Sequence, residues 1–183
     1  IDAGPDFRQQ VLRERILKLD ALIMTHEHKD HTSGLDDVRS YNYLQGKALP
    51  VYGSDRVNRQ IRQEFEYIFT NSDYPGVPKI DLIEIENKDF LVEGVLFRPI
   101  QVYHHKLPVF GFRIGDFSYI TDANFISPAE IEKIKGSKII VLNALRRTEH
   151  ISHFNLDQAV KVLTDLNPEK AFLTHISHQL GLH

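Results

Sequence analysis

Histidine is the residue whose number and spacing first suggest chemistry in this sequence. All ten histidines fall in four short clusters, which are His26/His28/His31, His104/His105, His150/His153 and His175/His178/His183. Histidines with no shared role would be scattered, so clusters far apart along the chain suggest that several imidazoles meet at one site. Cysteine is absent, which excludes disulfides and cysteine-based metal sites within these residues.

The densest cluster lies in the segment 25–31, Thr-His-Glu-His-Lys-Asp-His. It follows the apolar run 21–25, so we expect it to form the loop at the carboxyl end of a buried strand. On a helix, His26 and His28 would point about 200° apart, whereas in an extended turn they can share one ion. Asp30 and His31 then reach a second position nearby. Imidazole and carboxylate ligands together suit zinc, manganese or iron.

The motif His26-x-His28-x-Asp30-His31 resembles that of the metallo-β-lactamase superfamily of binuclear hydrolases. The segment 1–4, Ile-Asp-Ala-Gly, resembles the Asp-x-Gly that ends a strand ahead of this motif, and the likeness extends over the whole chain. The resemblance implies two divalent metal ions, zinc or manganese, and seven ligands. One ion is held by His26, His28 and His104, the other by Asp30, His31 and His175, and Asp122 bridges them.

Two further histidines, His105 and His178, are also candidate metal ligands. His105 competes with His104 as a ligand, and a subgroup pattern His-x-Lys-Leu favours His104. The segment 173–179 resembles the C-terminal signature of the phosphoribosyl 1,2-cyclic phosphate phosphodiesterase-like branch of the superfamily. That branch also holds a third, structural zinc through three upstream cysteines and a histidine that corresponds to His178. Because the chain opens at an expected strand end and stops without a closing element, we expect a domain truncated at both ends, with such cysteines upstream of Ile1.

The function expected from this resemblance is a binuclear metal-dependent phosphodiesterase. It would cleave a small cyclic or nucleotide-like phosphodiester by means of a hydroxide that bridges two metal ions. The expected catalytic residues are Asp30, as a metal ligand, and His153, as a general acid or a phosphate contact. Arg146 and Arg147 follow a predicted strand and could bind a substrate phosphate as a fork, although either could equally form a surface salt bridge.

Three other functions remain open at this point. Two are hydrolases of the same superfamily, a tRNA 3′-processing endonuclease and a thioester hydrolase, and the third is a non-catalytic metal-binding module. No Gly/Lys-rich insertion resembles the tRNA-binding arm of such endonucleases, and 22 basic against 25 acidic residues provide no broad basic face for nucleic acid. All seven ligand positions are filled, which disfavours the non-catalytic module.

The elements around these residues predict an α/β fold. Length and a 42% hydrophobic content suit a single domain over 1–183 without a linker. We expect helices over 7–19, from 34, over 55–69, from Pro128 and over 156–166, and a loop over 71–78. Strands are expected over 21–25, 50–53, 80–85, 90–97, 100–102, 138–142 and 171–174, with a hairpin, 110–114 and 117–120, around Gly115-Asp116.

The resemblance implies that these elements form an αββα sandwich, with two mixed sheets and helices on the outer faces. No apolar run has the length of a membrane span, and the chain does not open on a signal peptide, so we expect a cytoplasmic protein. The resemblance is also compatible with a homodimer.

Overall fold

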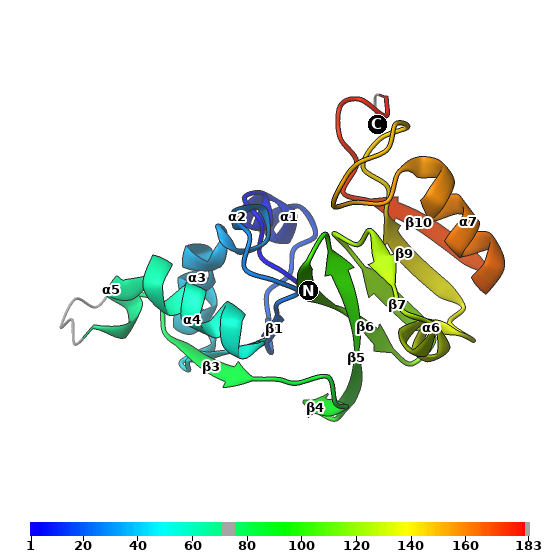
Figure 1. The fold of residues 1–183 in the computed structure, drawn as a ribbon. Coiled ribbons are helices and arrows are strands. Elements are labelled where there is room, and N and C mark those ends of the chain that lie inside the picture. Colours follow the sequence, from blue (N-terminus) through cyan, green and yellow to red (C-terminus); the bar gives the residue numbers. More distant parts are fainter. Residues whose placement is uncertain (71–75, 182–183) are drawn as a thin grey trace. The chain divides into compact units, whose positions relative to one another are not determined.

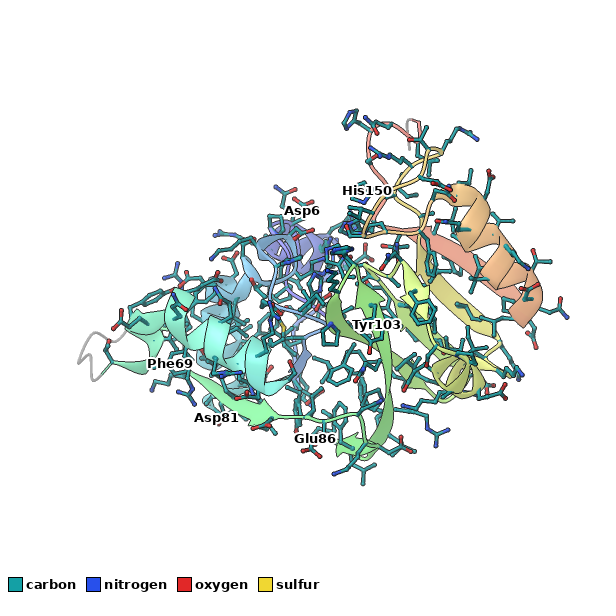
Figure 2. All side chains as sticks on the ribbon, in the orientation of Figure 1. Asp6, Phe69, Asp81, Glu86, Tyr103 and His150 are labelled. Atoms are coloured by element: carbon teal, nitrogen blue, oxygen red, sulfur yellow. The ribbon has the colours of Figure 1, made fainter. Side chains whose placement is uncertain are left out.

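The computed structural model describes residues 1–70 and 76–181, so the expected loop over 71–78 and the cluster residue His183 lie partly or wholly outside the described residues. The chain divides into two compact units, Ile1–Glu86 and Asn87–His183, and each has its own hydrophobic core. Figure 1 shows the elements of both units, and Figure 2 labels Glu86, where the first unit ends. None of the helices in the described residues is long and apolar enough to cross a membrane.

The first unit is built on a parallel sheet of three strands, in the order β1 (Leu22–Ile23), β2 (Leu49–Gly53) and β3 (Ile80–Glu84). Buried residues alternate along β2, as expected for a strand with one covered face. The core combines strand residues such as Val51 with Val57 and Ile61 of α4. The helices are α1 (Phe7–Arg13), α2 (Lys29–Thr32), the 3₁₀ helix η1 (Leu35–Val38), α3 (Arg39–Gln45), α4 (Asp55–Glu64) and α5 (Glu66–Phe69).

The second unit is built on a seven-stranded mixed sheet, in the order β10-β9-β7-β6-β5-β4, with β8 paired to β5. The β10–β9 and β9–β7 pairs are parallel and the other pairs are antiparallel. Two helices accompany the sheet, α6 (Pro128–Ile134) and α7 (Leu156–Leu166), and α7 contacts β9 (Figure 1). The strands are β4 (Phe90–Val92), β5 (Val95–His104), β6 (Leu107–Ile114), β7 (Phe117–Ile120), β8 (Phe125–Ile126), β9 (Ile139–Asn143) and β10 (Lys170–Thr174).

Local signals confirm several predicted elements. Ser127 accepts a hydrogen bond from the Glu130 amide at the start of α6, with Pro128 in the first turn. The helix predicted over 156–166 is α7, and it begins with a capping box between Asn155 and Gln158. Gly115 adopts a positive φ of 57° in the turn between the antiparallel strands β6 and β7, as the hairpin prediction requires.

Three predicted elements are wrong in extent. The helix expected over 7–19 ends at Arg13, and Arg15 adopts a φ of 52°, which a continuing right-handed helix does not allow. The helix expected over 55–69 is broken at Phe65, with φ −113° and ψ 39°, into α4 and α5. The strand expected over 90–97 is two antiparallel strands, because Glu93 and Gly94, both with positive φ, form a turn between them.

Candidate metal centre

The candidate ligands fall into two sets, one in each unit. The first set follows β1, where residues 24–28 are non-helical and His28, with φ −64° and ψ 150°, forms the N-cap of α2. Asp30 and His31 lie on α2 itself, so the prediction of a loop over 26–31 is wrong in its second half. The extended part allows His26 and His28 to approach each other, and Asp30 and His31 are adjacent residues in the first turn of α2.

The donor atoms of the first set lie at distances that suit shared ions. His26 Nε2 and His28 Nδ1 are 3.0 Å apart. His31 Nε2 lies 3.4 Å from an Asp30 carboxylate oxygen. Two atoms bound tetrahedrally to one zinc ion at about 2.1 Å lie roughly 3.4 Å apart. The spacing and chemistry of these donors therefore fit divalent metal binding.

Asp2 orients the histidines of this set through its carboxylate. It accepts hydrogen bonds from the Thr25 amide at 2.8 Å and the Thr25 hydroxyl at 2.9 Å, and it pairs with His31 Nδ1 at 2.8 Å. The Thr25 hydroxyl oxygen lies 3.0 Å from His26 Nδ1. A hydrogen on Nδ1 leaves the lone pair of a neutral imidazole on Nε2, so these contacts prepare His26 and His31 to bind metal through Nε2.

The segment that carries Asp2 is tied closely to the motif. The Ala3 amide donates to the His31 carbonyl at 2.8 Å, and the Gly34 amide donates to the Ala3 carbonyl at 2.8 Å. A Cβ on Gly34 would lie 2.3 Å from the Gly4 carbonyl oxygen and 2.8 Å from the Phe7 Cβ. Only glycine at position 34 therefore permits this close approach.

We expect Gly34→Ala to lower the free energy of unfolding by about 2–3 kcal/mol, because backbone atoms cannot move aside for the added methyl group. Gly46→Ala is the matched control, since Gly46 has a φ of 66° and open space around it. Backbone conformation alone should cost that variant about 1 kcal/mol. Urea denaturation of the metal-free proteins measures both values, and equal losses would contradict the steric argument.

The second set includes two strand-end residues in an unusual backbone conformation. Asp122 follows β7 and His175 follows β10, with φ angles of 58° and 54°. Asp2 shares this conformation, with a φ of 58°. Left-handed backbone at non-glycine residues costs energy and clusters at functional sites. Here it accompanies a short contact, since His175 Nδ1 lies 3.0 Å from Asp122 Oδ1.

His104 ends β5, and its Nδ1 atom lies 2.9 Å from the Ser152 carbonyl oxygen. A carbonyl only accepts hydrogen bonds, so this contact places the imidazole proton on Nδ1 and the lone pair on Nε2. His105 is exposed in the turn before β6, where its amide donates to the Asn124 side chain. The geometry favours His104 over His105 as a ligand.

His153 lies among the histidines of the second set. Its ring centroid is 4.5 Å from that of His104 and 4.8 Å from that of His175, and potential ligand atoms of His104, Asp122 and His153 lie within 4.8 Å of one another. Burial is the main cause that lowers the pKa of His153 to about 4. The charge of Asp122 raises this pKa, and the neighbouring imidazoles lower it further. Its buried Nδ1 has no hydrogen-bond partner within residues 1–70 and 76–181. His153 is therefore an uncharged imidazole near neutral pH.

The remaining predicted residues lie in the segments after β9 and β10. Arg146 donates hydrogen bonds to the carbonyls of Thr148 and Glu149 and to the Gln179 side chain, so its guanidinium holds this loop together. Arg147 and His178 are exposed. His150, labelled in Figure 2, has its ring centroid 5.0 Å from that of His153. Burial, followed by the charges of Arg146 and His104, lowers the pKa of His150.

Sequence reasoning missed several residues that support the ligands. Asn143, fully buried at the end of β9, donates to the Ala123 carbonyl and accepts from the Ala123 amide, which holds the chain next to Asp122. Thr121 donates to Asp122 at 2.7 Å, as Thr25 contacts His26. A threonine precedes the candidate ligand at three strand ends, Thr25-His26, Thr121-Asp122 and Thr174-His175, and this repetition was the available signal.

Three similar proteins are informative. An octanoyltransferase from Porphyromonas gingivalis is 38% identical over 185 residues, which cover all of this chain and 37% of that protein. A ribonuclease Z from Lactobacillus helveticus is 29% identical over 126 residues, which cover 64% of this chain and 38% of that protein. The crystal structure of a diphosphatase from the PhnP family is 35% identical with a TM-score of 0.90, covering 98% of this chain and 68% of that chain.

The chain thus spans less than two fifths of the length of these two curated relatives. A family model described as a beta-lactamase superfamily domain matches residues 1–176, and so covers both units and all seven candidate ligands. The α/β fold, with two sheets and accompanying helices, agrees with this match. The chain belongs to the metallo-β-lactamase superfamily of metal-dependent hydrolases.

Proposed function

We propose that the two ligand sets join in one centre of two divalent metal ions, and that the protein is a phosphodiesterase acting on a small cyclic or nucleotide-like phosphodiester. The observation that carries the choice of substrate class is the similarity to the diphosphatase from the PhnP family, at 35% identity over 98% of this chain. A diphosphatase and a phosphodiesterase both cleave a bond between phosphorus and oxygen. The same site chemistry therefore serves both reactions.

The proposed ligands divide as the sequence motif suggests. His26, His28 and His104 would hold one ion, Asp30, His31 and His175 the other, and Asp122 both. When bound, such a pair of ions activates water and neutralises the charge of the phosphoryl oxygens. The spacing of the donors around His26 and His31 supports this assignment, as does the orientation of His104 by the Ser152 carbonyl.

His153 would then act on the substrate. Its buried, uncharged ring lies beside His104 and His175, where it can donate a hydrogen bond to a phosphoryl oxygen or to the departing alkoxide. Arg147, which is exposed in the loop after β9, is the arginine that we propose for phosphate contact. The Arg146 side chain instead stabilises the loop, because it donates hydrogen bonds to the carbonyls of Thr148 and Glu149.

The experiment that tests this function is hydrolysis of bis(p-nitrophenyl) phosphate, with manganese and zinc supplied separately, followed by small cyclic phosphates and diphosphates. We expect metal-dependent turnover that His26→Ala and His104→Ala lower by at least about a hundredfold. His105→Asn is the matched control and should retain activity, because asparagine tolerates the left-handed backbone at this exposed turn. Two bound metal ions without any phosphodiester or diphosphate cleavage would overturn the proposal.

A second candidate is tRNA 3′ processing, favoured by the match to ribonuclease Z from Lactobacillus helveticus. The near balance of 22 basic and 25 acidic residues disfavours it, because tRNA binding relies on neutralising many phosphates. Cleavage of a precursor tRNA at its 3′ end, with weak cleavage of small diesters, would support this candidate over the first.

A further inference from the structure

The two non-ligand positions inside the histidine motif are both charged, and both contact α4. Glu27 lies between His26 and His28, and its carboxylate accepts a hydrogen bond from Arg56 Nε at 2.5 Å. Lys29 lies between His28 and Asp30, and its ammonium lies 2.7 Å from a Glu64 carboxylate oxygen. The motif is therefore joined to the helix on both sides of His28.

The two contacts lie at opposite ends of α4. Arg56 is the second residue of this ten-residue helix and Glu64 is the last, so the contacts are about 12 Å apart along its axis. The acidic partners are largely shielded, since the side chain of Glu27 is 11% exposed and that of Glu64 is 15% exposed. Glu64 also accepts a hydrogen bond from Gln60, and Lys29 lies 5.7 Å from the centre of the Phe65 ring.

The charges of Arg56 and Glu64 are opposite to those that stabilise a helix. A cation near the N-terminus and an anion near the C-terminus oppose the helix dipole. Asp55 in the first turn and Arg62 in the last turn have the favourable signs. The helix dipole alone would favour an acidic residue at position 56 and a basic residue at position 64. The contacts with Glu27 and Lys29 therefore explain why Arg56 and Glu64 stand there.

The helix is itself a fixed part of the first unit. Val57 and Ile61 are buried in the core, and the Asn58 side chain donates to the Gly53 carbonyl at the end of β2. A Cβ on Gly53 would lie 2.8 Å from Val57 Cγ1. Because α4 packs this closely on the sheet, it can hold the motif in place.

We propose that α4 is a rigid support for the metal-binding motif, and that Arg56 and Glu64 are positioning residues which set the geometry of the metal ligands through Glu27 and Lys29. The inference rests on the proposed metal centre, because its effect is on metal ligands. Hydrogen bonds made directly to metal ligands change metal affinity by about 10–100-fold. Glu27 and Lys29 are chain neighbours of the ligands, so we expect their contacts to act at the lower end of this range, about tenfold. The two ion pairs should therefore affect metal binding more than folding.

The test is a charge exchange at the Lys29–Glu64 pair. Lys29→Glu and Glu64→Lys should each weaken zinc or manganese binding about tenfold, measured by competition with a chromogenic chelator. The double variant should recover affinity to within about threefold of wild type, because the ion pair is restored with reversed polarity. Arg56→Glu should produce a loss similar to that of each single variant.

Arg59→Glu is the matched control, because it makes the same charge change on α4 and breaks a surface pair with Asp55 instead of a contact with the motif. It should leave metal affinity, kcat and KM unchanged. Single variants with unaltered metal affinity would overturn the inference, as would losses that the double variant does not recover. Metal binding by wild type without phosphodiester cleavage would overturn the proposed function alone, and a wild-type protein that binds no divalent ion would overturn both.

Discussion

Asp122→Asn is expected to lower kcat for phosphodiester hydrolysis by about a thousandfold or more, the largest effect of any single substitution considered. The Asp122 side chain is 1% exposed, and its potential ligand atom lies within 4.8 Å of those of His104 and His153, so its negative charge is central to the second ligand set. Asparagine keeps the shape and tolerates the left-handed backbone but has no charge. The bound metal should fall from two equivalents to one or fewer, measured by elemental analysis after gel filtration.

Two further substitutions at this position separate ligand chemistry from backbone strain. Asp122→Ala and Asp122→Gly both remove the ligand and should be equally inactive. The φ of 58° at this residue suits glycine and strains alanine. The metal-free Gly variant should therefore be about 1 kcal/mol more stable than the Ala variant, as measured by urea denaturation. Activity in either variant close to wild type would refute the proposed role of Asp122.

Asp2→Asn is expected to weaken binding of at least one metal ion by about 10–100-fold, although Asp2 is not a proposed ligand. The Asp2 carboxylate accepts hydrogen bonds from the Thr25 amide and hydroxyl and pairs with His31 Nδ1. An asparagine that accepts from the Thr25 amide would present its NH₂ group to His31 Nδ1 and the Thr25 hydroxyl. The His31 proton would then shift to Nε2, which is the atom needed for the metal.

The measurement for Asp2 is a chelator competition with zinc and with manganese, alongside kcat and KM. Asp6→Asn is the control, because Asp6 is an exposed residue near the same end of the chain and its side chain makes no capping hydrogen bond to α1 (Figure 2). That control should bind metal as wild type does. If Asp2→Asn also binds metal normally, His31 does not depend on Asp2 for its tautomer.

Much of the fold could be predicted from local signals. Asn155 and Gln158 fix the start of α7, Ser127 and Pro128 fix the start of α6, and Gly115 marks a tight turn, because capping and turn chemistry act over three or four residues. The errors lie where the backbone changes direction inside an apolar pattern, at Phe65 and at the Glu93-Gly94 turn. The helix break at Phe65 and the hairpin at Glu93 interrupt patterns that look continuous in hydrophobicity.

The family and the types of candidate ligand could be predicted from the sequence, because the motif at 26–31 brings four metal-binding side chains into six residues and the other candidates follow predicted strands. The orientation of those donors depends on contacts that form when the chain folds. These contacts join residues that are between 29 and 48 positions apart in the sequence. They are the contact of Asp2 with His31, that of the Ser152 carbonyl with His104, and the two ion pairs between α4 and the motif. Periodicity and spacing carry no information on such contacts, because hydrogen-bond direction and helix packing arise only when the chain has folded.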